Sequence, residues 1–169
     1  MPDSDWTLVG DIDIRRCLSV SDTSYFYDEP IMLPMAAGTY TICVHNADVE
    51  GNRHVMAIKV TCSSEGSNRG RRLGEVIVDF GQLGICDRDA VEKAFEVLGD
   101  LGMSTYFDQL QTATGLTGWI VLPGAVRMAM IRPGFGDGRY PVFELLDGTG
   151  NAVGVEIECS ISKSDHETR

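Results

Sequence analysis

The chain has 169 residues, of which 43% are hydrophobic, and a formal net charge of −11 at pH 7. This length suffices for a substantial core, and the ordinary apolar share excludes a disordered or fibrous protein. The acidic balance argues against nucleic-acid binding, because phosphate recognition requires a basic surface. The sequence contains no apolar run of membrane-spanning length and no signal peptide, so we expect a cytoplasmic protein without membrane contact.

The cysteines are spread along the chain in an odd number and without a CxxC pair. This pattern indicates buried, reduced thiols rather than disulfides, and the clustered spacing of a zinc site is absent. We therefore expect no metal and no cofactor. The five residues are Cys17, Cys43, Cys62, Cys86 and Cys159.

The first part of the chain predicts short strands with alternating apolar residues. A polar loop over 46–53 is expected to join two of them into a hairpin, with Ile42 opposite Ile58 so that one face is apolar. Residues 63–72 are small, polar and basic, and predict a flexible linker. The expected strands are Trp6–Ile14, Cys17–Val20, Gly38–Val44 and His54–Val60.

The second part contains the clearest helix signal. Asp87 or Asp89 can cap its start and Gly99 can end it, and 104–111 predicts a second short helical turn. A turn at Asp147–Asn151 predicts a hairpin, because aspartate, asparagine and glycine favour chain reversal. The expected strands are 116–122, 125–131, Tyr140–Leu146 and Ala152–Cys159.

Residues 75–87 align without a gap on residues 10–22. Leu18 falls on Leu83, and Asp22 falls on Asp87. We therefore predict an internal repeat of 6–62 and 75–161 within a single domain. The expected fold is β-rich α+β, with two pseudo-repeated antiparallel β units packed as a sandwich or half-open barrel and one or two short helices inserted in the second half.

The stretch Gly134-Phe-Gly-Asp-Gly-Arg-Tyr-Pro-Val142, with the hairpin after it, resembles a bacterial family of unknown function. This is domain-of-unknown-function family 4241, whose members tend to end in a Gly-Trp-Gly-Asp-Gly-x-Tyr-Pro signature. Phe135 stands here where tryptophan is usual. The resemblance supports the β-rich fold and implies a bacterial origin, and it transfers no activity.

Three groups of residues are candidates for a site. Asp137, with Arg132, Arg139 and Tyr140, could form a rim site for a sugar, peptide or ion, or could simply close a turn. Asp87 and its counterpart Asp22 could act as a carboxylate pair, although a helix cap is the simpler role for Asp87. The aromatic residues from Tyr25 to Tyr27 could anchor an interface or cover one end of the sandwich.

The chain contains no catalytic motif that we recognise. The leading hypothesis is a protein-binding module that is not an enzyme, of the immunity type or an accessory factor, with a basic protein as partner. The alternative is a small-ligand-binding or hydrolytic domain with its site at Gly134–Tyr140. A cavity holding Asp137, Arg139 and Asp87, with a raised carboxyl pKa, would favour the ligand hypothesis. A flat acidic face with exposed Tyr25 and Tyr27 would favour the partner hypothesis.

Overall fold

The structure, a computed structural model, describes residues 6–26 and 30–160. Its strands are β1 (Trp6–Ile14), β2 (Cys17–Asp22), β3 (Ile31–Pro34), β4 (Gly38–Val49), β5 (Asn52–Thr61), β6 (Asn68–Val78), β7 (Leu83–Asp87), β8 (Thr117–Leu122), β9 (Val126–Ile131), β10 (Gly138–Leu146) and β11 (Ala152–Glu158). The helix α1 spans Arg88–Thr112, and η1 (Thr23–Tyr25) and η2 (Pro123–Ala125) are 3-10 turns. Within this described part, no helix is long and apolar enough to cross a membrane.

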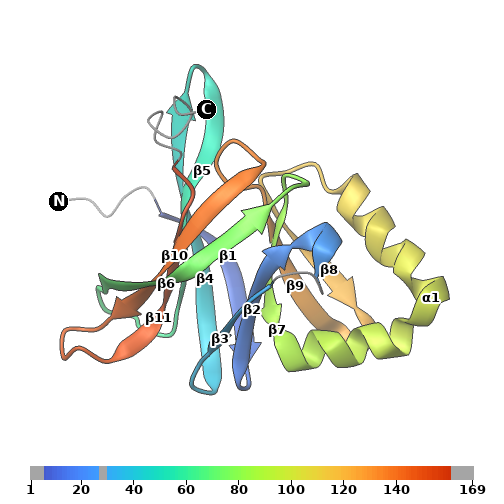
Figure 1. Cartoon of the computed structure of the whole chain (residues 1–169), viewed down its shortest axis with the longest axis horizontal. Coiled ribbons are helices and arrows are strands. Elements are labelled where there is room, and N and C mark those ends of the chain that lie inside the picture. The colour runs from blue at the N-terminus through green and yellow to red at the C-terminus, as the bar shows by residue number, and fades with distance from the viewer. Residues whose placement is uncertain (1–5, 27–29, 161–169) are drawn as a thin grey trace.

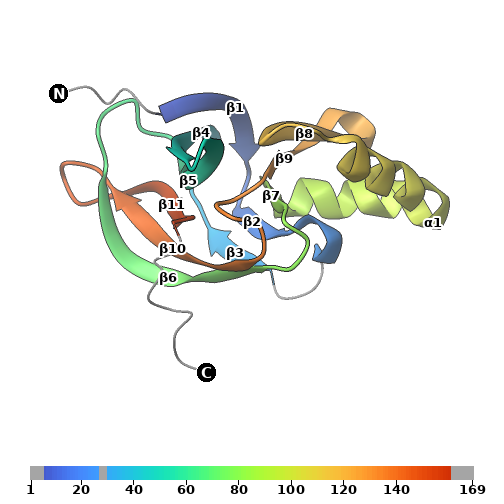
Figure 2. The same ribbon diagram turned by 90° about the horizontal axis from the view of Figure 1, so that it is seen from above.

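The strands form two antiparallel sheets that pack face to face (Figures 1 and 2). The six-stranded sheet has the order β1-β4-β5-β11-β10-β6, and the five-stranded sheet has the order β3-β2-β7-β9-β8. The helix α1 covers the outer face of the five-stranded sheet, as Figure 2 shows. The predicted β-rich α+β sandwich is therefore confirmed, with the helix inserted in the second half.

Two hydrophobic cores follow from these three layers. The larger core lies between the sheets and is built from alternating strand residues such as Ile42, Val60 and Val142, all fully buried. The smaller core lies between the five-stranded sheet and α1, where Phe95 and Tyr106 meet edge to face at 5.0 Å. The helix thus covers a sheet face that would otherwise expose apolar side chains to water.

The helix α1 bends at Gly99, the residue at which the sequence predicted its end. Gly99 has a φ of +58° and a ψ of −170°, which are not helical values and which glycine adopts without a Cβ penalty. A second helical leg follows, and it covers the predicted turn at 104–111. The bend lets the two legs run back over the same sheet (Figure 1).

The hairpin of β4 and β5 differs from the prediction. The strands continue to Val49 and restart at Asn52, so most of the loop expected over 46–53 is strand. Ile42 pairs with Val60 instead of Ile58, and a bulge between His45 and Asn46 shifts the register. The offset of two residues has two sources: the bulge inserts one residue, and the pairing next to the turn at Val49 and Asn52 already differs by one from the predicted pairing.

The linker expected over 63–72 is also partly wrong, because β6 begins at Asn68. Two of its arginines contact carboxylates of β10 and β11: Arg71 lies 3.5 Å from Glu144, and Arg69 contacts Glu156. The strand β6 forms one edge of its sheet. Polar and charged residues are common on edge strands, because they discourage further strand pairing. The composition of this edge strand therefore resembles that of a loop.

Candidate functional site

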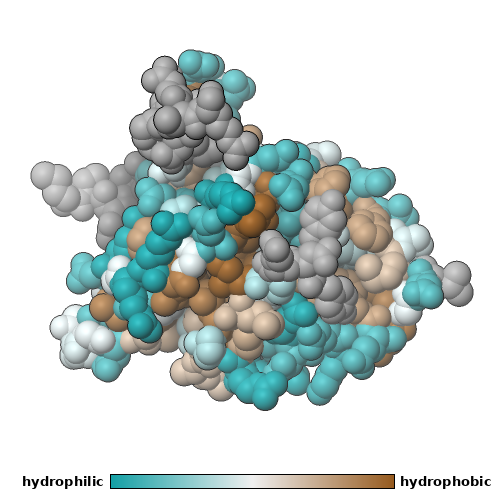
Figure 3. Space-filling model, viewed as in Figure 1, coloured by the Kyte–Doolittle hydropathy of each residue, from teal (hydrophilic) through white to brown (hydrophobic). Residues whose placement is uncertain are grey.

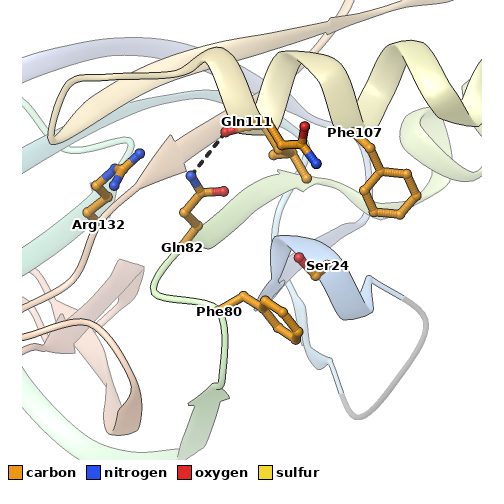
Figure 4. Close-up of a pocket in the computed structure, with 7 residues that line it drawn as sticks. Ser24, Phe80, Gln82, Phe107, Gln111 and Arg132 are labelled. Atoms are coloured by element: carbon orange, nitrogen blue, oxygen red, sulfur yellow. Dashed lines mark hydrogen bonds between the residues drawn. The ribbon is translucent and has the colours of Figure 1, made fainter.

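A groove of about 480 Å³ opens between the loop after β6, the turn η1 and the second leg of α1. Figure 4 shows Arg132 at one end of the groove, Phe107 at the other, and Gln82 between them. Among the described residues, its wall combines two aromatic rings, two amides, a hydroxyl, a leucine side chain and one cation, and includes no carboxylate. The lining residues are Ser24, Phe80, Gln82, Phe107, Leu110, Gln111 and Arg132.

Asp22 holds two walls of the groove in place. Its Oδ1 accepts a hydrogen bond from the backbone N–H of Ser24 at 2.8 Å, which caps η1. Its Oδ2 accepts from the backbone N–H groups of Asp79 and Phe80, both at 2.8 Å. Asp22 is itself buried, so one carboxylate fixes both the turn and the loop that carries Phe80.

Two further side chains attach α1 to these walls. Gln82 donates from Nε2 to the carbonyl oxygen of Leu110 at 3.2 Å (Figure 4), and its Oε1 accepts from the Thr23 hydroxyl at 3.3 Å. The Tyr106 hydroxyl donates to the Thr23 carbonyl at 2.6 Å. Burial raises the pKa of Tyr106, so this hydroxyl remains a donor at physiological pH.

The aromatic wall is unusually open to solvent. Phe80 is 58% exposed and Phe107 is 40% exposed. An exposed aspartate adjoins each phenylalanine in the chain: Asp79 precedes Phe80, and Asp108 follows Phe107. Exposed apolar rings bordered by polar residues are typical of a binding surface.

The opposite end of the groove carries Arg132. Its Nη2 donates to the carbonyl oxygen of Ala113 at 2.6 Å, which ties β9 to the end of α1. Its Nε is buried and has no acceptor among the described residues. A buried donor without an acceptor is costly, and its lack of exposure keeps this Nε out of reach of a molecule in the groove.

The predicted loop Gly134–Tyr140 has mainly structural contacts. The Tyr140 side chain is buried, and its hydroxyl lies 2.6 Å from the carbonyl oxygen of Gly136. Burial raises the pKa of Tyr140 to about 12. A Cβ at Gly134, where φ is +44°, would overlap the carbonyl oxygen of Cys159. Only glycine therefore fits at this position, and Tyr140 faces the interior.

The two charged residues of this loop lie at the surface. Arg139 forms an ion pair with Glu75 at 2.7 Å, across the β6–β10 pairing. Asp137 is exposed and lies beside Gly81. Of Arg132, Asp137, Arg139 and Tyr140, only Arg132 is among the described residues that line the groove.

Asp87 lies in a different place from Asp137 and Arg139. It occupies the N-cap position of α1, yet its side chain makes no capping hydrogen bond. It lines a second cavity with Arg15 and Arg127, and neither Asp137 nor Arg139 lines that cavity. Burial raises the pKa of the Asp87 carboxyl. The raised carboxyl pKa expected for a ligand site is found at Asp87. Asp87 does not, however, share this cavity with Asp137 and Arg139.

The tyrosine prediction falls at the edge of the described residues. Tyr25 belongs to η1 and follows Ser24 of the groove wall. Tyr27 lies outside the described residues, so the exposed tyrosine cluster stays a prediction.

The groove residues Phe80 and Phe107 are not among the site residues predicted from the sequence. Phe80 stands between β6 and β7, next to Gly81, and so lies outside the two strands. Phe107 follows the core residue Tyr106 and therefore points to a different side of the helix. The sequence therefore indicates an exposed position for each ring. That the two rings line one groove follows only from the packing of α1 on the sheet.

Comparison with known proteins gives no match: no family model fits the chain, and no curated protein or solved structure is significantly similar to it. The resemblance to domain-of-unknown-function family 4241 therefore stays a prediction.

Proposed function

We propose that this chain is a protein-binding module whose partner docks on the groove that contains Phe80 and Phe107. The observation that carries the proposal is that two exposed phenylalanine rings, Phe80 and Phe107, line one groove. Aromatic rings supply much of the binding energy of protein interfaces, because they bury a large area with few rotatable bonds.

A basic partner fits the surroundings of these rings. Asp79, Asp108 and Asp137 are exposed around the groove, and the chain as a whole carries a net charge of −11. Figure 3, which shows hydropathy, has hydrophilic side chains along the lower edge over the first leg of α1, whereas the groove lies at the second leg. A lysine or arginine of the partner could pack its stem on an aromatic face and direct its charge to an aspartate.

The test is a pull-down from lysate of the native host at low and high salt, with the wild-type protein and matched variants. We expect one basic protein to bind the wild type, to dissociate as salt rises, and to be lost with Phe80→Ala and Phe107→Ala. Asp79→Asn with Asp108→Asn should weaken capture mainly at low salt, because exposed charges are screened.

The control is Leu8→Ala, which removes a 66% exposed apolar side chain on β1, outside the groove. It should leave capture unchanged. Capture that survives both phenylalanine variants would contradict the proposal, as would recovery of the chain alone at both salt concentrations.

The proposal also includes two expectations from the sequence. One is a bacterial, cytoplasmic setting, and the other is an internal duplication of the chain. The order of strands supports the duplication: β1, β4 and β5 form one half of the six-stranded sheet, and β6, β10 and β11 form the other half in mirrored order. The alternative, a ligand-binding or hydrolytic site at Gly134–Tyr140, stays a prediction, and the structural contacts of Tyr140 and Gly134 do not favour it.

A further inference from the structure

The strand β8 forms one edge of the five-stranded sheet, and a groove of about 400 Å³ opens between it and the C-terminal end of α1. Figure 2 shows β8 beside the second leg of α1. The groove is lined by Gln109, 112–115 and 117–120. Among the described residues, none that lines it is charged, and none also lines the groove of Phe80 and Phe107.

Hydrogen bonds at both ends of β8 show which of its main-chain groups face this edge. The N–H and the carbonyl of Val121 are both bonded to the side chain of Gln109, so they point away from β9. Just before β8, the carbonyl of Leu116 accepts from the N–H of Arg132 at 2.8 Å and so points toward the side of β9. Because this direction alternates along an antiparallel strand, the odd-numbered residues of β8 face away from β9.

Thr117 and Trp119 therefore direct their main-chain donors and acceptors to the free edge, where no other described strand pairs with β8. The side chain of Trp119 is held in place. Its Nε1 donates to the carbonyl of Val9 at 3.4 Å, and the guanidinium of Arg127 lies 4.2 Å from its ring centre. A partner that pairs with this edge finds it already ordered, which lowers the entropic cost of binding.

The other sheet edges of the described chain are protected in ways that the start of β8 is not. On β1, the carbonyls of Val9 and Asp11 accept from Trp119 Nε1 and Arg127 Nη2. The strand β6 carries three arginines, and β3 has only four residues and ends at Pro34. Covered main-chain groups, charge, short length and proline all discourage strand pairing. The start of β8, which has none of these, is open to a partner.

The Gln109 amide shows which chemistry this edge accepts. Its Nε2 and Oε1 bond to the carbonyl and the N–H of Val121, both at 2.9 Å, as the peptide groups of a neighbouring strand would. The amide occupies one position of the edge and leaves Thr117 and Trp119 open. It therefore blocks a long strand, such as one from a second copy of this chain, and leaves room for a short one.

We propose that a short, uncharged, extended segment of another protein pairs with Thr117 and Trp119 and adds a strand to the five-stranded sheet. This is recognition by strand addition, in which main-chain hydrogen bonds supply affinity and side-chain positions supply specificity. The segment residue opposite Trp119 lies beside the indole, so a β-branched or aromatic side chain fits there. The next residue faces the end of α1, where Thr112 and Thr114 line the groove, and a small or hydroxyl side chain fits.

The probe is a library of random heptapeptides displayed on phage and selected on the full chain. We expect enriched peptides in which β-branched or aromatic residues alternate with small ones. An enriched peptide, acetylated and amidated, should shift the nuclear magnetic resonance amide signals of Thr117 and Trp119 and leave that of Gln82, in the other groove, in place. Methylation of its amide nitrogens, one at a time, should abolish binding at alternate positions, because only every second amide points to β8.

Thr117→Pro removes one outward N–H, and proline is tolerated at the first residue of a strand and on edges. It should weaken peptide binding by about tenfold or more. The matched control Thr117→Val keeps the N–H and should bind as the wild type does, and thermal melting shows whether both variants fold. If Thr117→Pro does not fold, the methylated peptides decide alone.

Four results would overturn the proposal. They are the enrichment of no peptide, shifts confined to the groove of Gln82, binding that survives methylation at every amide, and full binding by a folded Thr117→Pro variant.

Discussion

At the scale of single residues, Asp22 and Asp87 show how the same residue type acquires different properties from its neighbours. Asp22 is buried with both oxygens satisfied and holds η1 to the loop after β6. Asp87 is equally buried, but its Oδ1 has no hydrogen-bond partner among the described residues. Burial therefore raises the pKa of Asp87 above its value in the unfolded chain, about 3.9.

This shift predicts how stability depends on pH. The folded protein holds the Asp87 proton more tightly than the unfolded chain does, so ionisation of Asp87 destabilises the fold. The cost is present above the folded pKa and disappears as pH falls through that value toward the unfolded pKa. Asp87→Asn removes the charge and keeps a residue suited to the N-cap. We expect it to raise the free energy of unfolding at pH 7.

Urea denaturation at neutral and at acidic pH checks this prediction. The advantage of Asp87→Asn over the wild type should shrink as pH falls toward about 4, because the wild-type carboxyl then becomes protonated. Asp89→Asn, which removes an exposed ion pair with Arg16, should not stabilise the protein at pH 7. An Asp87→Asn variant less stable than the wild type at pH 7 would show that the carboxylate has a structural partner.

At the scale of elements, β8 illustrates how the fold protects an exposed sheet edge. It is the last strand of the five-stranded sheet and pairs only with β9. The Gln109 side chain occupies part of its free edge: Nε2 donates to the carbonyl oxygen of Val121, and Oε1 accepts from the Val121 N–H, both at 2.9 Å. The amide thus replaces one residue of a neighbouring strand, which blocks pairing with another chain.

Gln109→Ala should open this edge. Loss of the two hydrogen bonds is expected to cost about 1 kcal/mol of unfolding free energy, since the edge is partly solvated. Light scattering at high protein concentration should show more self-association than the wild type. Thr105→Ala, an exposed change on the same helix, is the control and should behave as the wild type. Unchanged stability and association of Gln109→Ala would contradict the protective role of the amide.

The elements also show what the sequence could predict. The turn at Asp147 was predictable because its contacts are local: Asp147 Oδ1 accepts from the backbone N–H groups of Thr149 and Asn151, both at 2.9 Å. The sequence predicts a helix end at Gly99, also from a local signal, and the structure has a bend there instead. The start of β6 was missed because its arginines are stabilised by distant partners such as Glu156. The groove and the cavity were missed because each joins segments far apart in the chain.

At the scale of the whole molecule, strand pairing relates the two halves of the chain. In one row of the six-stranded sheet, Glu158 faces Ala57, which faces His45, which faces Trp6. In another row, Thr61 faces Gly154, which faces Leu145, which faces Arg69. Each row therefore runs from the end of one half to the start of the other across three strand spacings, about 14 Å.

The five-stranded sheet repeats this relation at its centre. Val20 of β2 pairs with Ile85 of β7, and these are the two residues that coincide when 10–22 is aligned on 75–87. Leu18 pairs with Asp87, and Asp22 pairs with Leu83. A local two-fold axis between β2 and β7 accounts for this pattern. The duplication of the two halves stays a prediction, and it has a consequence for connectivity.

If the halves are equivalent, a connection from the end of β11 to the start of β1 should serve as well as the natural one from β5 to β6. A circular permutant that joins residue 169 to residue 1 and opens the chain at Gly66 tests this. The segments 161–169 and 1–5 provide ample length for a gap of about 14 Å, because an extended residue spans about 3.3 Å. We expect the permutant to fold, with a melting temperature within a few degrees of the wild type.

The matched control is a permutant with the same junction that opens between Gly84 and Ile85, in the buried strand β7. It should not fold, since the break removes the pairing of β7 with both β2 and β9. If the Gly66 permutant also fails to fold, the connection from β11 to β1 is not equivalent to the one from β5 to β6. The mirrored strand order would then reflect the limited number of ways in which strands join in a sandwich, rather than a duplicated unit.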